Sequence, residues 1–118
     1  MITVPFTVMI AAEQNGLVQT VSSILRLLSL SCVITMTTNA AEKVIESLRE
    51  QEPNLLILGF SRSSARSVIH EARARRPGMR VLWLSESTEP LPEADATMPQ
   101  PLTALRLINA VSKALQSS

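Results

Sequence analysis

Apolar runs typical of β-strands alternate along this chain with stretches whose apolar residues recur at helical spacing. Alternation of this kind favours an α/β fold built on a parallel sheet. The run from Phe6 to Ala12 is apolar at every position except Thr7, as expected of a central strand covered on both faces. In the segment 32–37, Cys32, Ile34 and Met36 alternate with Val33, Thr35 and Thr37, and this period of two suits a half-exposed edge strand.

The remaining elements follow from the same patterns. Further strands are expected at 55–58, 81–85 and 94–98, and a helix is expected around Ala65, Val68, Ile69 and Ala72. Asn15 is expected to cap the first helix, and Asn39 with Glu42 to open the second as a capping box. The last helix is expected to start at Pro101 and to bury Leu105, Ile108, Leu115 and either Val111 or Ser112.

The segment 87–93 breaks the alternation, because Pro90 and Pro92 disfavour a helix there. Parallel neighbouring strands usually need a connection of about a dozen residues or more, and this one is shorter. We predict an extended loop over the sheet; a rearranged fifth strand is the alternative. Without a covering helix, apolar residues of the last two strands should be exposed, among them Val81, Leu82, Trp83, Leu84 and Met98.

Length and composition favour one domain over residues 1–118, since 46% hydrophobic residues are enough for a single core. The lone Cys32 argues against a disulfide framework and favours a reduced, cytoplasmic setting. The chain lacks an apolar stretch of the roughly 20 residues that a membrane span needs, so no membrane association is expected. Asp95 is the only aspartate, which excludes chemistry based on clustered aspartates. No nucleotide-binding glycine motif occurs, and neither a cofactor nor a metal is expected.

The order of strands and helices resembles the receiver domain of two-component response regulators. This resemblance implies a doubly wound, five-stranded parallel sheet with strand order 2-1-3-4-5. The fourth helix of that fold would be missing or replaced by a loop, in line with the two prolines.

Most residues that define the receiver site are absent. Two acids end the first strand of receiver domains, the phosphate-accepting aspartate ends the third, a serine or threonine ends the fourth, and a lysine precedes a proline after the fifth. The corresponding residues here are Ala11 and Ala12 with Glu13 just beyond, then Gly59, Ser85 and Gln100. That chemistry needs carboxylates for Mg²⁺ and an aspartate nucleophile. The resemblance is therefore to an atypical, degenerate receiver of the pseudo-receiver type, without phosphorylation or enzymatic activity.

A cluster of arginines around the third helix is the most distinctive surface feature: Arg62, Arg66, Arg73, Arg75, Arg76 and Arg80. It could contact an acidic protein or phosphates, but neither a helix-turn-helix nor a set of stacking aromatics supports nucleic acid. We predict a regulatory module that binds other proteins and forms a homodimer. Two alternatives remain. One is a small-ligand sensor at the carboxyl ends of the strands, and the other is the receiver part of a DNA-binding regulator.

Overall fold

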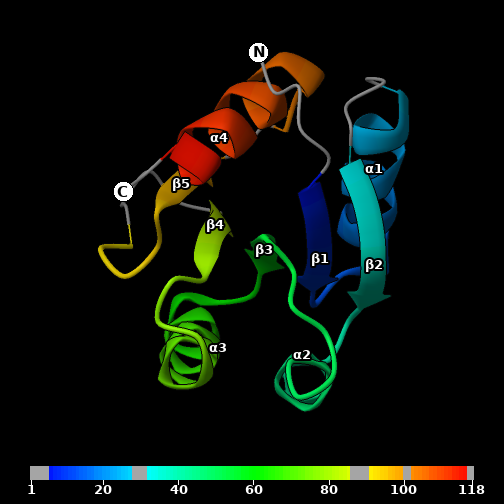
Figure 1. Cartoon of the computed structure of the whole chain (residues 1–118). Coiled ribbons are helices and arrows are strands. Elements are labelled where there is room, and N and C mark those ends of the chain that lie inside the picture. The colour runs from blue at the N-terminus through cyan, green and yellow to red at the C-terminus, as the bar shows by residue number, and fades with distance from the viewer. Residues whose placement is uncertain (1–5, 28–31, 86–90, 100–101, 117–118) are drawn as a thin grey trace.

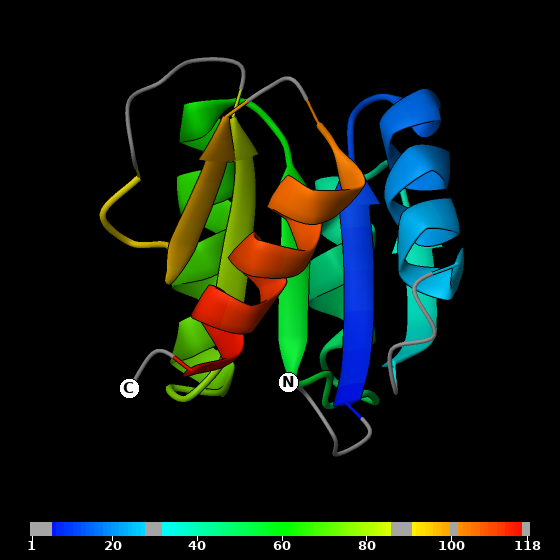
Figure 2. The ribbon, with the colours of Figure 1, turned by 90° about the horizontal axis from the view of Figure 1, so that it is seen from above.

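The protein is described by a computed structural model, which covers residues 6–27, 32–85, 91–99 and 102–116. Five strands form one parallel sheet: β1 (Phe6–Ala12), β2 (Cys32–Thr38), β3 (Leu55–Gly59), β4 (Arg80–Ser85) and β5 (Ala96–Pro99). Their order is β2-β1-β3-β4-β5, so the predicted strand order is confirmed. The strands point the same way, and their carboxyl ends share one edge of the sheet (Figure 2).

Four helices cover the two faces of the sheet. They are α1 (Asn15–Leu27), α2 (Ala41–Ser47), α3 (Arg62–Arg75) and α4 (Ala104–Gln116). Helices α1 and α4 lie on one face, and α2 and α3 on the other (Figure 1). In the central strand β3, Leu55 and Ile57 point into the first core and Leu56 and Leu58 into the second. No helix within the described ranges is long and apolar enough to cross a membrane.

The two predicted asparagine caps are wrong. Helix α1 begins at Asn15 itself, and the carbonyl of the preceding Gln14 accepts its first backbone hydrogen bonds. At α2 the N-cap is Ala40, which has no side-chain cap, so Asn39 lies one residue too early to close a capping box. The hydroxyl of Thr38 instead accepts a hydrogen bond from the Ala40 N–H at 3.2 Å.

The buried face of α4 also differs from the prediction. The helix begins at Ala104, after Thr103, whose hydroxyl accepts a hydrogen bond from the Arg106 N–H at 3.2 Å. The fully buried residues are Leu107, Val111 and Ala114, whereas the side chain of Leu105 is 69% exposed. Two helical positions correspond to a turn of about 200°, which places Leu105 on the side away from Leu107. Ile108 and Leu115 are half-buried, and Pro101 lies outside the described residues.

The connection between β4 and β5 reaches the sheet as a loop where the structure describes it. Its described part, residues 91–95, consists of turns, and β5 starts at Ala96 rather than at 94; residues 87–90 of the predicted loop lie outside the described ranges. The expected exposure of the last two strands is wrong: Val81, Leu82, Trp83, Leu84 and Met98 are all at most 5% exposed. Helix α4 covers one face of these strands, and Leu91, itself 2% exposed, packs with Trp83 and α3 on the other. A loop residue thus supplies the missing cover.

Candidate functional site

The predicted site residues on the strands do come together at the carboxyl edge of the sheet. Ala12 is paired directly with Gly59 across β1 and β3, and Ser85 ends the next strand, β4. Ala11, Ala12 and Ser85 are buried, and Gly59 is half-buried. Gln100 lies outside the described residues.

The space beside Gly59 is filled by apolar side chains. A Cβ atom at Gly59 would lie 2.7 Å from the Cβ of Ala12 and 2.7 Å from Cδ2 of Leu17. Real Cβ atoms essentially never approach another atom so closely, so even a methyl group there would require a shift. Leu17 reaches this position from the first turn of α1. No local sequence pattern marks Leu17 for this position, because its place against Gly59 depends on how α1 packs.

Glu13, the acid next to Ala11 and Ala12, connects the loop after β1 to the loop after β3 through hydrogen bonds. Its backbone N–H donates to the carbonyl of Gly59 at 3.3 Å, and its Oε1 accepts from the N–H of Ser61 at 3.3 Å. Ser61 is the N-cap of α3, so this carboxylate lies at the positive end of the helix dipole. Glu13 therefore ties the end of β1 to the start of α3.

Next to this tie, the ring of Trp83 packs beneath the loop that leads into α3. Its Nε1 donates to the carbonyl of Phe60 at 3.0 Å, and the Arg62 guanidinium lies 6.0 Å from the ring centroid. The latter is at the outer limit of a cation–π contact. The edge of the sheet between β3 and β4 is thus built from hydrophobic and aromatic groups.

Ala11, Ala12 and Gly59 carry no functional group that could bind a metal ion or react with a substrate. The methyl groups of Ala11 and Ala12 and the bare Cα of Gly59 provide neither metal ligands nor a nucleophile. Across the described ranges, no group of three or more His, Cys, Asp or Glu side chains could hold a metal ion. A cavity of about 300 Å³ does lie at the carboxyl edge, but between α1 and β2 rather than over Gly59. It is lined by Asn15, Val18, Gln19, Thr37, Thr38 and Asn39.

The arginines around α3 are divided among several intramolecular contacts. Arg66 pairs with Glu93 at 3.2 Å, and Arg76 pairs with Glu52 at 2.7 Å. Arg62 lies over Trp83, as described above, and Arg75 is exposed. Most arginines of the predicted cluster are therefore already engaged in contacts within the chain.

Arg73 belongs to a structural cluster centred on Asp95. Its guanidinium contacts Oδ2 of Asp95 at 2.9 Å and also donates to the carbonyls of Met79 and Glu93. The same Oδ2 accepts from the N–H of Val81 at 2.7 Å. The sole aspartate of the chain thus anchors the loop before β5 to β4 and α3, a role that its sequence position did not indicate.

No protein-family model and no curated protein matches the chain. Its structure is similar to that of CheY4, a chemotaxis response regulator of Vibrio cholerae, with a TM-score of 0.80 and 14% identity over 95% of this chain and 100% of that one. It is also similar to a LuxR-family DNA-binding response regulator from Staphylococcus aureus, with a TM-score of 0.76 and 19% identity over 94% of this chain and 99% of that one. The chain has the fold of a receiver domain. A third similar structure is that of RcsB from Salmonella enterica serovar Typhimurium, bound to promoter rprA in the presence of the phosphomimetic BeF3⁻. Its TM-score is 0.79 and its identity 14% over 96% of this receiver-fold chain.

These likenesses, at 19% identity or less, establish the receiver fold and nothing finer. The chain spans 63% of the RcsB chain in the promoter complex. Within the receiver fold, Gly59 stands at the end of the third strand, where receiver domains carry their phosphate-accepting aspartate.

A side chain at position 59 is expected to destabilise this receiver-fold protein. Gly59→Ala should lower the free energy of unfolding by about 1–3 kcal/mol, because the added methyl group overpacks against Leu17 and Ala12. Gly78→Ala is the matched control, since no atom lies within 4 Å of a Cβ placed there. It should change stability by no more than about 0.5–1 kcal/mol, and in the stabilising direction if at all. Urea denaturation compares the two variants; equal effects would mean that the space beside Gly59 is not filled in solution.

Proposed function

We propose that this chain is a receiver-like signalling module that acts by binding other proteins, without phosphorylation and without enzymatic activity. The observation that carries the proposal is the filled space at Gly59, where Leu17 and Ala12 occupy the volume that an acceptor side chain would need. Ala11 and Ala12 in place of acids also leave Mg²⁺ without its usual carboxylate ligands.

The tie made by Glu13 supports the same proposal. A phosphoryl group at such an edge would act by attracting the groups of neighbouring loops, above all the N–H groups at a helix start. Here a carboxylate of the chain itself already accepts from the Ser61 N–H at the start of α3. The loops after β1 and β3 are thereby joined without any added anion, which favours the same arrangement of this edge with and without phosphate.

Self-association is part of the proposal, but not through the last two strands, which are buried. Among the described residues, the exposed large apolar side chains are Leu105 on α4, at 69%, and Val33 on β2, at 55%. Leu105 is the candidate contact, because half-buried Ile108 lies one turn further along the same helix. Exposed apolar residues that lie together often mark an interface, and a symmetric pair is the commonest way to cover them. A cytoplasmic location is inferred along with this role.

Sedimentation equilibrium tests the proposal. At tens of micromolar the protein should sediment as a dimer, equally with and without acetyl phosphate and Mg²⁺. Leu105→Glu should shift it to monomer, because a charge would be buried at the contact. Ser67→Glu, on the exposed side of α3, adds the same charge and should leave the dimer intact. A dimer that forms only with acetyl phosphate would contradict phosphorylation independence, and a monomer throughout would remove self-association.

The two alternatives are supported less well. A role as the receiver part of a DNA-binding regulator is favoured by the likeness to RcsB bound to promoter rprA and to the LuxR-family regulator. For a small-ligand sensor, the 300 Å³ cavity between α1 and β2 is the available place, because Leu17 fills the position beside Gly59.

A further inference from the structure

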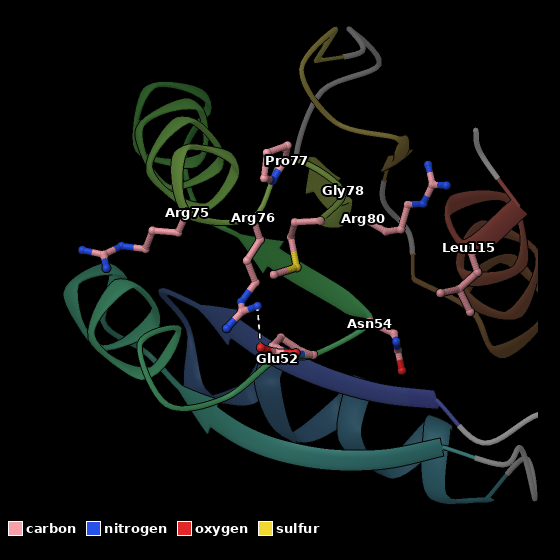
Figure 3. Close-up of a pocket in the computed structure, with 10 residues that line it drawn as sticks. Glu52, Asn54, Arg75, Arg76, Pro77, Gly78, Arg80 and Leu115 are labelled. Atoms are coloured by element: carbon pink, nitrogen blue, oxygen red, sulfur yellow. Dashed lines mark ion pairs between the residues drawn. The ribbon is translucent and has the colours of Figure 1, made fainter.

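A second cavity, of about 560 Å³, opens at the amino ends of the strands, opposite the degenerate site. Its walls come from the segment before β3, from the turn between α3 and β4, and from Leu115 near the end of α4 (Figure 3). Cavities of this size are typical of binding sites. Three arginines and one glutamate are the charged residues that line it: Arg75, Arg76, Arg80 and Glu52.

Arg76 is the central cation of this cavity, and its hydrogen-bonding capacity is only partly used. Its Nη1 lies 2.7 Å from Oε1 of Glu52, whereas its Nε is buried and has no hydrogen-bond partner within the described part of the chain. A guanidinium binds a carboxylate best through two parallel N–H groups. The carboxylate that Arg76 holds belongs to a side chain that is 73% exposed. Ion pairs with so exposed a partner are weak, so an incoming carboxylate could replace Glu52 at little cost.

Arg75 and Arg80 place further positive charge on either side of this pair. Arg75 points outward on one side in Figure 3, and no ion pair to it is found within the described ranges. Arg80 points to the other side, and its Nη1 lies 3.7 Å from Oδ1 of Asp95, at the outer limit of an ion pair. The helix dipole explains basic residues in the last turn of α3, but Arg80 lies on β4. The side chains of Arg75 and Arg80 thus extend away from the Arg76–Glu52 pair in opposite directions (Figure 3).

We propose that this cavity binds an acidic segment of a partner protein. One carboxylate of the segment takes the place of Glu52 on Arg76, and neighbouring carboxylates contact Arg75 and Arg80. The inference rests on the proposed protein-binding function and adds the chemistry of the partner. Nucleic acid is disfavoured because the residues that line the cavity include no aromatic ring on which a base could stack, and because Glu52 would repel phosphates.

Fluorescence anisotropy with a labelled hexaglutamate peptide at low ionic strength tests this proposal. Arg76→Gln should weaken binding about tenfold or more, because charge-assisted, bidentate contacts are the strong class of hydrogen bond. Arg26→Gln removes the same charge from an exposed position on α1, on the other face of the sheet, and should change the affinity by less than about twofold at matched ionic strength. Glu52→Gln should tighten binding several-fold, since it removes the internal competitor.

The Glu52 variant keeps the test decisive if Arg76→Gln folds poorly, because a gain in affinity cannot arise from unfolding. Equal losses for Arg76→Gln and Arg26→Gln, or unchanged affinity for Glu52→Gln, would overturn the proposal. So would tighter binding of a single-stranded oligonucleotide of equal charge, or no binding of hexaglutamate up to millimolar concentration. None of these outcomes bears on phosphorylation or on the dimer, so the proposed function and this site can fail separately.

Discussion

Replacing Asp95 with alanine is expected to lower the free energy of unfolding by about 3 kcal/mol, near the lower end of the range for breaking a buried ion pair. The carboxylate of Asp95 is 13% exposed and binds Arg73, which is itself 31% exposed. Its removal would leave the N–H of Val81 without its 2.7 Å acceptor and Arg73 without its counter-charge. The loop before β5 would lose the side-chain contacts of Asp95 with β4 and α3, whereas the backbone bond from the Asp95 N–H to the Val81 carbonyl at 2.9 Å would remain.

Urea denaturation monitored by circular dichroism measures this effect. Asp95→Asn should lie between the wild type and Asp95→Ala, because the amide oxygen still accepts from Val81 but carries no charge. Glu46→Ala is the control: its carboxylate lies 4.0 Å from Lys43, and both side chains are about two-thirds exposed. That change should cost no more than about 0.5 kcal/mol. If Asp95→Ala costs as little as Glu46→Ala, the loop is not anchored as described.

Leu91→Ala is expected to lower the free energy of unfolding by about 2–5 kcal/mol, the usual range for truncating a fully buried leucine. Leu91 is 2% exposed and packs in the same core as Trp83, Val81 and α3. It lies on the sheet face that carries α2 and α3, in the connection between β4 and β5 where the receiver fold would have a further helix. Truncation would open a cavity over Trp83 and leave apolar surface of β4 open to water.

Leu105→Ala is the matched control for this change, because the same atoms are removed from a side chain that is 69% exposed. It should alter stability by less than about 0.5 kcal/mol when measured at protein concentrations low enough to keep the chain monomeric. The Leu91 variant should also bind a hydrophobic dye more strongly than the wild type. Similar costs for the two leucines would mean that residues 91–95 do not cover the sheet in solution.

The sheet could be predicted from the sequence because its signal is local and strong. Strands β1, β3 and β4 are short apolar runs, and the central run from Leu55 to Leu58 is buried on both faces as its unbroken apolarity predicts. The helix starts were less predictable. Asn15 and Asn39 both have the right chemistry for a cap, yet the chain enters each helix one residue away from the expected position. The choice of Leu107 over Leu105 for the core depends on how α4 is rotated against the sheet.

The sequence predicted which functional groups the candidate site lacks, but not which side chains occupy the space instead. The positions of Ala11, Ala12 and Gly59 follow from the strand ends alone. Leu17 against Gly59, Leu91 over Trp83 and Asp95 beneath Arg73 are contacts between separate elements, set by how α1 packs and by the path of a loop. No local pattern encodes such contacts. The expected exposure of β4 and β5 was wrong for this reason, since α4 and Leu91 cover these strands.

Phosphorylation independence is tested most directly by intact-mass measurement after incubation with acetyl phosphate and Mg²⁺. A receiver domain that carries the acceptor aspartate, treated in parallel, shows that the reagent is active. The filled space at Gly59 and the alanines at positions 11 and 12 predict that the mass of this protein stays unchanged at every time point. A stoichiometric phosphate adduct that survives acid and is lost in base would contradict the account.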